Sequence, residues 1–159
     1  DEIDDDYIDN LTKTYRSIYA RSWSIKTKMY DGIEDLLRSL HKKDCRLAVL
    51  SNKPDDFTRL MVDHYFPSGM FDIVYGLPEN WPAKPEPDLA LHICGQLGIK
   101  PENAALIGDS GSDMVTAVRA GMKPLGVLWG FRDATELKAG GAEELFATTQ
   151  ELEKYLLAD

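Results

Sequence analysis

The chain has 159 residues, of which 43% are hydrophobic and 28% are charged, as is typical of one globular domain that buries a core. Its net charge of −9 argues against nucleic acid or an anionic membrane as a partner, and no apolar run approaches the roughly 20 residues of a membrane span. Cys45 and Cys94 lack the close spacing of a metal motif or disulfide framework, so they predict two reduced thiols in a cytoplasmic protein.

The first part of the chain predicts one amphipathic helix over roughly residues 1–22. Its apolar residues recur at helical spacing: Ile8, Leu11, Tyr15, Ile18 and Tyr19. The organisation of the chain changes after this helix, where strands begin to alternate with helices. We therefore divide the sequence into a helical piece, residues 1–24, and an α/β core domain, residues 25–159.

The core alternates between helical and strand patterns. Strands are expected at 46–51, 71–76, 104–108 and 125–130, and helices at 31–40, 54–61, 87–97, 112–121, 134–139 and 149–157. Asp31 is the expected N-cap of the first of these helices, and Pro54 is expected in the first turn of the second. The proline-rich segment 81–87 predicts an extended loop. Such an alternation with short links favours a Rossmann-like parallel sheet with helices on both faces.

Polar residues follow two of the predicted strands, at the edge where ligands bind in open parallel sheets. The strand at 46–51 ends in Ser51, and Asn52 and Lys53 come next. Asp109 and Asp113 follow the strand at 104–108, and Lys84 lies between the two strands in the chain. We expect these groups to converge on one edge of the sheet.

Each of these residues has a chemical use at such an edge. Ser51 and Asn52 can donate to phosphate oxygens, as can the free N–H groups of the helix that Pro54 opens. Lys84 would supply a fixed positive charge. Asp109 and Asp113 lie four residues apart, and two neighbouring carboxylates favour a hard cation such as Mg²⁺.

Taken singly, the same residues have ordinary interpretations. Ser51 and Asn52 could form a turn and helix cap, Lys84 could be a solvated lysine, and the two aspartates could be a loop residue and a first-turn helix charge. Isolated histidines and tryptophans are expected to have structural or surface roles: His41, His64, His92, Trp81 and Trp129.

The combination is more specific than its parts, because it resembles three motifs of the haloacid-dehalogenase superfamily in order and spacing. The matching segments are LAVLSNKP (47–54), AKPEPD (83–88) and LIGDSGSDMVTAVRAGM (106–122). The Ser-Asn-Lys-Pro wording and the tail WGFRDATELKAGGAEEL (129–145) are most similar to phosphoglycolate phosphatase-like members. The first helix is similar to the last helix of their small helical cap.

The resemblance implies a Mg²⁺-dependent phosphatase that hydrolyses a small phosphorylated metabolite through an aspartyl-phosphate. It implies that Ser51, Asn52 and Lys53 bind the transferring phosphoryl group. It also implies that Lys84 neutralises the nucleophile and the phosphate, and that Asp109 and Asp113 hold the metal. The sequence leaves the substrate and the oligomeric state open.

One family motif has no match, namely the apolar strand followed by Asp-x-Asp-Gly that supplies the nucleophile. Asp4 and Asp6 have the spacing, but Ile3 is their only apolar lead-in, and they are expected to be surface acids of a helix. We therefore expect the central first strand of the sheet and most of the cap to be missing, and the chain alone to be inactive.

Two other functional classes were weighed against the phosphatase. A non-catalytic phosphate- or Mg²⁺-binding domain stays open as the alternative. A receiver-like signalling domain is disfavoured, because Lys84 precedes Asp109 and that order is wrong for a receiver.

Overall fold

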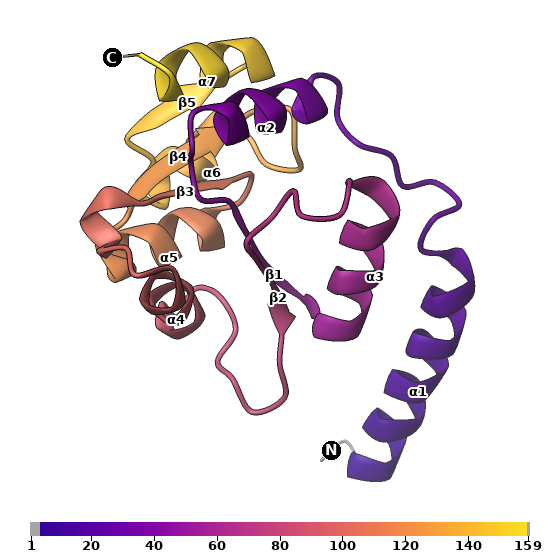
Figure 1. The fold of residues 1–159 in the computed structure, drawn as a ribbon. Helices are drawn as coiled ribbons and strands as arrows, with labels where there is room; N and C mark the ends of the chain where they lie inside the picture. The colour runs from indigo at the N-terminus through magenta and orange to yellow at the C-terminus, as the bar shows by residue number, and fades with distance from the viewer. Residues whose placement is uncertain (1–3, 159) are drawn as a thin grey trace.

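The computed structural model describes residues 4–158, except for the side chain of Asp5, and divides them into an outlying helix and an α/β core (Figure 1). Ile3 therefore lies outside the described residues. The outlying helix is α1, Asp5–Ser22, with Asp4 as its N-cap. Asp4 and Asp6 are exposed at the start of this helix, so the prediction that they are surface acids is confirmed.

The strands of the described residues form two separate parallel sheets. One sheet contains β1 (Ala48–Pro54) and β2 (Ile73–Leu77). The other has the order β3-β4-β5, with strands β3 (Ala105–Gly108), β4 (Lys123–Val127) and β5 (Glu144–Phe146). All pairings are parallel, as the alternating sequence pattern predicts.

Helices connect the strands and pack on their faces. They are α2 (Ile33–Lys42), α3 (Asp55–Tyr65), α4 (Asp88–Leu97), the short 3-10 helix η1 (Pro101–Asn103), α5 (Gly111–Ala120), α6 (Ala134–Ala139) and α7 (Thr149–Leu156). None of the helices within residues 4–158 is long and apolar enough to cross a membrane.

The three-stranded sheet has helices on both faces (Figure 1). On one face, α2 and α7 cover β4 and β5 with a cluster that includes Leu36, Leu125 and Leu152. On the other face, α5 packs against β3 and β4 with Met114 and Ala117, which are fully buried. The middle strand β4 is consequently buried from Pro124 to Val127.

The two-stranded sheet carries a bulge at its functional end. Ala48, Val49 and Leu50 of β1 pair in register with β2, and then the register shifts before Pro54 pairs with Leu77. Three residues of β1 therefore lie opposite one residue of β2, Gly76, and such a bulge turns side chains out of the regular ladder. Ser51, Asn52 and Lys53 occupy this irregular stretch.

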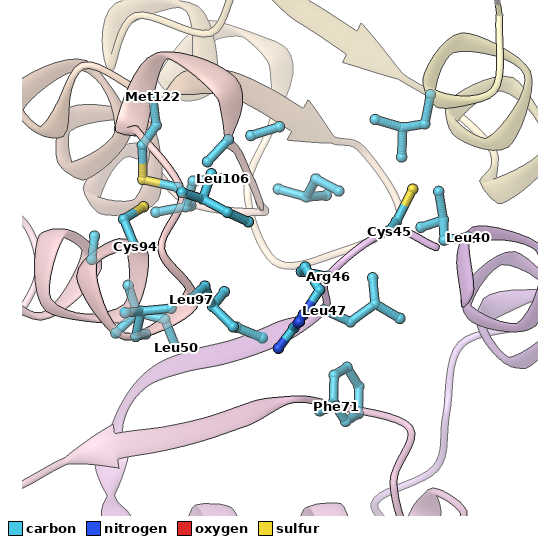
Figure 2. A pocket seen from close by; sticks show the side chains of 18 of the residues that line it. Leu40, Cys45, Arg46, Leu47, Leu50, Phe71, Cys94, Leu97, Leu106 and Met122 are labelled. Atoms are coloured by element: carbon cyan, nitrogen blue, oxygen red, sulfur yellow. The ribbon is translucent and has the colours of Figure 1, made fainter. Parts of the chain in front are cut away.

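A cavity of about 540 Å³ separates the two sheets and is lined mostly by apolar side chains (Figure 2). We call this cavity the seam. Its lining residues come mainly from α2, β1, α4 and β3 and include Leu36, Leu47, Leu50, Ile93, Leu97, Leu106 and Ile107. Within the described residues, β1 pairs only with β2 and β3 only with β4, so the edges of β1 and β3 on either side of the seam lack a strand partner.

Helix α1 packs against α3 through aromatic side chains. Tyr19 contacts Phe57 edge-on at 5.0 Å between ring centroids, and Trp23 contacts His64 at 5.1 Å. Arg16 forms an ion pair with Asp56. The rest of the apolar stripe of α1 is exposed, including Leu11 and Ile18. That residues 1–24 are a cap remnant stays a prediction.

Several predicted boundaries differ from the structure. Gly32, not Asp31, caps α2, since its φ of 78° suits glycine. Pro54 ends β1 and precedes α3 rather than lying in its first turn. Segment 81–87 is a loop, but it is not extended, because turns close at Pro78–Trp81 and Ala83–Glu86.

Two short elements have no counterpart in the sequence prediction, and three strands are displaced. Strand β1 begins two residues after its predicted start at 46 and continues to Pro54 instead of ending at Ser51. Strand β5 and η1 contain three residues each, which is too short for a periodic pattern. Strand β4 begins two residues before the predicted start at 125, because Lys123 and Pro124 are not part of the apolar run from which the strand is predicted. Strand β2 begins two residues after the predicted start at 71.

Candidate active site

The bulge of β1 presents Ser51 at the carboxyl end of the strand. Its hydroxyl oxygen accepts the backbone N–H of Lys53 at 3.1 Å. This bond fixes the oxygen and leaves the hydroxyl proton free to be donated elsewhere. The Ser51 hydroxyl can thus donate to an anion near the bulge.

Asn52 and Lys53 point to different neighbours. The side chain of Asn52 makes two hydrogen bonds with the backbone of Lys84, at 2.8 and 3.1 Å. The ammonium group of Lys53 binds the hydroxyl of Tyr19 in α1 and lies 4.6 Å from the centre of its ring. The structure therefore brings Asn52 to the lysine loop, whereas it directs Lys53 toward α1.

Lys84 links the two halves of the molecule. Its Nζ lies 3.3 Å from the carbonyl oxygen of Leu50 in β1 and 2.6 Å from Oδ1 of Asp113 in α5. The two charged side chains are 13% and 8% exposed, so this pair is largely shielded from water. The three matched sequence segments thus meet at Lys84, as predicted.

Asp113 is held from two sides. Its Oδ2 accepts hydrogen bonds from Ser110 N at 3.0 Å and Ser110 Oγ at 2.6 Å, while Oδ1 faces Lys84. Ser110 caps α5 in return, forming a reciprocal capping box. A Cβ on Gly108 would overlap the side chain of Asp113, so glycine is needed for this close approach.

Asp109 directly follows β3 and faces the loop after β4. Its Oδ2 accepts the backbone N–H of Phe131 at 2.9 Å. A Cβ on Gly130 would overlap this carboxylate, so glycine at that position lets the loop lie against it. Asp109 and Asp113 therefore have different surroundings despite lying four residues apart.

The residues at the strand ends could supply some of the ligands of a magnesium ion, but not all of them. Mg²⁺ commonly takes one or two protein carboxylates and fills its other positions with water and substrate phosphate. Asp109 has one oxygen, Oδ2, in a hydrogen bond, whereas both oxygens of Asp113 are engaged. Among residues 4–158, no group of three His, Cys, Asp or Glu side chains is close enough to hold a metal alone.

The sequence analysis missed two contributors to this arrangement. Ser110 positions Asp113, and the Ser-x-x-Asp spacing of a capping box at the predicted helix start could have identified it. Phe131 binds Asp109 through its backbone N–H, which no side-chain pattern reveals.

Asp55 stabilises the end of the two-stranded sheet beside the site. Burial raises the pKa of its carboxyl, but hydrogen bonds from Arg59 and Gly76 N, together with the charge of Arg59, outweigh this and lower the pKa below its usual value. The carboxylate is therefore kept ionised. It lies 2.7 Å from Arg59 Nε and 2.9 Å from Gly76 N.

The first turn of α3 is less suited to bind an anion than the sequence predicts. In its first turn, the N–H of Phe57 donates to the Asp56 carboxylate at 2.9 Å. The carboxylates of Asp55 and Asp56 also bring negative charge to this turn. The donors and cations available to an anion are then chiefly the Ser51 hydroxyl and the Lys84 ammonium group.

Comparison with known proteins shows which family this chain matches. The sequence matches the haloacid dehalogenase-like hydrolase family over residues 2–127. A phosphoglycolate phosphatase from Aquifex aeolicus is 32% identical over 127 residues, which cover 80% of this chain and 60% of that protein. Another from Psychrobacter arcticus is 28% identical over 156 residues, covering 98% and 68%.

Solved structures agree with the sequence comparison. A crystal structure from Lactobacillus delbrueckii subsp. bulgaricus, of a protein provisionally assigned as a phosphoglycolate phosphatase, superposes with a TM-score of 0.89 and 32% identity. The match covers 99% of this chain and 65% of that one. The chain spans about three fifths to two thirds of the length of these relatives. The family match, the parallel α/β fold and the meeting of the three motifs at Lys84 together show that the chain belongs to the haloacid dehalogenase-like hydrolases.

Proposed function

We propose that this chain forms most of the core of a Mg²⁺-dependent phosphatase that acts on a small phosphorylated metabolite through an aspartyl-phosphate. The named relatives are phosphoglycolate phosphatases, so 2-phosphoglycolate is the first substrate to test. The observation that carries the proposal is the position of Lys84, whose ammonium group lies between the end of β1 and Asp113. A shielded cation at the strand ends suits a transferring phosphoryl group.

The residues of this chain have separate roles in the proposed reaction. Ser51 donates its hydroxyl proton to a phosphoryl oxygen, and Lys84 offsets negative charge on the nucleophile and the phosphoryl group. Asp113 orients Lys84 through the 2.6 Å ion pair. Ser110 in turn keeps Asp113 in place.

Asp109 is the residue of this chain best placed to ligate Mg²⁺, and Asp113 would reach the ion directly or through water. When bound, Mg²⁺ would supply positive charge to the phosphoryl oxygens. The nucleophile is proposed to be an aspartate on a further strand that fills the seam. The unpaired edges of β1 and β3 and the apolar lining of the seam support this placement.

Phosphate release tests the proposed function. The complete protein, with Mg²⁺ and 2-phosphoglycolate, should release inorganic phosphate, and EDTA should abolish the release. Activity on other phosphomonoesters but not on 2-phosphoglycolate would keep the reaction and reject the substrate. No release from any phosphomonoester would reject the enzyme.

A pair of substitutions tests the metal assignment. Asp109→Asn should raise the Mg²⁺ concentration needed for half-maximal activity more than Asp113→Asn does, because Asp113 is already engaged by Lys84 and Ser110. Titration of Mg²⁺ against phosphate release in both variants measures this. Equal or reversed effects would contradict the assignment of Asp109 as the main Mg²⁺ ligand.

The second candidate function is a non-catalytic domain that binds phosphate or Mg²⁺. Such a domain would need no Asp-x-Asp-Gly segment, and none lies within these 159 residues. Calorimetry would then show phosphate or Mg²⁺ binding to the complete protein without turnover. Cytoplasmic location is also a proposal, supported by the two free thiols of Cys45 and Cys94.

A further inference from the structure

The side chain of Asn52 is tied to the backbone of one residue at two points. Its Oδ1 accepts the N–H of Lys84 at 2.8 Å, and its Nδ2 donates to the C=O of the same residue at 3.1 Å. This exchange resembles one hydrogen-bonded pair of a β-ladder, but a side chain supplies one half of it. The two bonds fix the peptide groups on both sides of the Lys84 Cα.

The surroundings of Asn52 explain how it reaches the loop. The register shift between Leu50 and Pro54 takes Asn52 out of the regular pairing with β2. The loop that carries Lys84 is turned toward it by the bond between Glu86 N and Ala83 O. Arg119 of α5 holds the other side of this turn, through Pro85 O at 3.3 Å and Glu86 Oε1 at 2.7 Å.

Lys84 is thereby held at both ends of its side chain. Asn52 holds the backbone, while the Leu50 carbonyl and the Asp113 carboxylate hold the ammonium group. The interpretation of Asn52 as a phosphate ligand is less consistent with this geometry. Rotating the amide toward a phosphate would break both bonds to Lys84.

We propose that Asn52 is a positioning residue for Lys84 and not a ligand of the phosphoryl group. The inference rests on the proposed function, because it assigns Asn52 a role in that reaction. Asn52 acts by fixing where the lysine charge lies, so its loss lowers turnover and leaves phosphate affinity nearly unchanged. A displacement of about 1 Å at a reacting centre can cost on the order of 100-fold in rate.

A double-mutant cycle in the complete protein tests this role. Asn52→Ala should lower kcat roughly 10- to 100-fold, with KM and inhibition by inorganic phosphate changed by less than about threefold. In the Lys84→Met background the same substitution should change kcat by less than about twofold, because the group that it positions is gone. Asn10→Ala, at an exposed position in α1, is the matched control and should change neither.

A second substitution separates position from chemistry. Asn52→Gln keeps the amide but moves it outward by one methylene, so it should lose most of the kcat that Asn52→Ala loses. A phosphate ligand would tolerate this longer side chain better. If Asn52→Ala does not fold, Asn52→Gln carries the same cycle. Additive losses with Lys84→Met, together with weakened phosphate inhibition, would overturn the proposal.

Hydrogen exchange gives a readout that needs no catalysis. The Lys84 amide, which donates to Asn52, should exchange about tenfold faster or more in Asn52→Ala, while the amides of β4 keep their protection. Unchanged exchange at Lys84 would reject the positioning role even in an inactive protein. Absence of phosphatase activity in the wild type, with faster exchange in the variant, would reject the proposed function and leave the contact established.

Discussion

The two sheets of this molecule contain similar strands but differ in burial. In the β3-β4-β5 sheet, Leu125 of β4 is fully buried between strands and helices. In the β1-β2 sheet, no residue of β1 is fully buried, although β1 contains as large a share of apolar residues as β4. Even β3 exposes Ile107 to 40%, on the strand that borders the seam.

This difference shows that, among the described residues, strand edges and apolar side chains are covered least at the seam. Strand edges and apolar side chains there lack partners within residues 4–158, whereas β4 has a strand partner on each side. The chemical groups gather at one end of the same seam, because Ser51 lies in the bulge of β1 and Asp109 follows β3. Stability and chemistry are thus concentrated in different parts of the molecule.

The largest expected effect concerns the chain of 159 residues tested alone. It should release no phosphate from p-nitrophenyl phosphate or 2-phosphoglycolate with Mg²⁺, because Asp113 is engaged by Lys84 and Ser110 and Asp109 is proposed to hold the metal, so neither carboxylate is placed to attack a phosphate. It should also self-associate through the strand edges at the seam. Phosphate assays over hours and size-exclusion chromatography measure both.

The control for this prediction is the Asp109→Asn variant of the same chain. Turnover that co-purifies with the wild-type chain and disappears in the variant would show that the nucleophile lies within these residues. Asp4 and Asp6 would then be the first residues to substitute.

Lys84→Met in the complete protein should lower turnover by more than about 100-fold while the fold persists. Loss of a fixed charge beside a phosphoryl transfer costs roughly 3 kcal/mol of transition-state stabilisation. Steady-state rates and circular dichroism decide this, and Lys138→Met on the exposed side of α6 is the control. Wild-type activity in the variant would show that Lys84 is an ordinary lysine with no role in turnover.

Truncating one side chain in β4 and one in β3 measures how differently the two strands contribute to the free energy of unfolding. Leu125→Ala should lower the free energy of unfolding by about 2–5 kcal/mol, because it opens a cavity in a closed core. Ile107→Ala should cost about 1 kcal/mol in this chain, since the side chain is already partly exposed. Urea denaturation of both variants gives the values.

The same pair sharpens the comparison in the complete protein. If a strand fills the seam there, the cost of Ile107→Ala should rise into the range of Leu125→Ala. An unchanged small cost would mean that the β3 edge stays uncovered.

The smallest expected effect is a pH-dependent one at Asp55. Because the pKa of this carboxyl is lowered in the folded state, it contributes stability above its unfolded value near 3.8, and the contribution is lost as the pH falls through the folded value. Asp55→Asn should therefore cost about 1 kcal/mol at pH 7 and less at an acidic pH below 3.8, where the contribution of the carboxylate declines. Chemical denaturation at both pH values measures the difference.

Asp88→Asn is the matched control for this substitution. Asp88 also opens a helix, but its side chain is exposed, and among the described residues its carboxylate makes no hydrogen bond or ion pair like those of Asp55. A cost at Asp55 that persists unchanged at low pH would show that the lost contact is not ionic.

The sequence by itself determined the order of the elements and the ends of the strands that carry chemistry. Period and turn residues predict α4 and α5 closely, because apolar spacing and glycine caps are local properties. Since the carboxyl ends of parallel strands share one edge, the meeting of the β1 segment with Lys84 and Asp113 also followed from the sequence.

Only the tertiary structure decided which groups each side chain reaches. Asn52 and Lys53 are neighbours in sequence, yet one binds the Lys84 backbone and the other binds Tyr19 of α1, because the β1 bulge turns them to different sides. The two aspartates differ for a similar reason, since the partner of Asp109 comes from a loop 22 residues further along the chain. These contacts join distant segments, and no local pattern of residues encodes them.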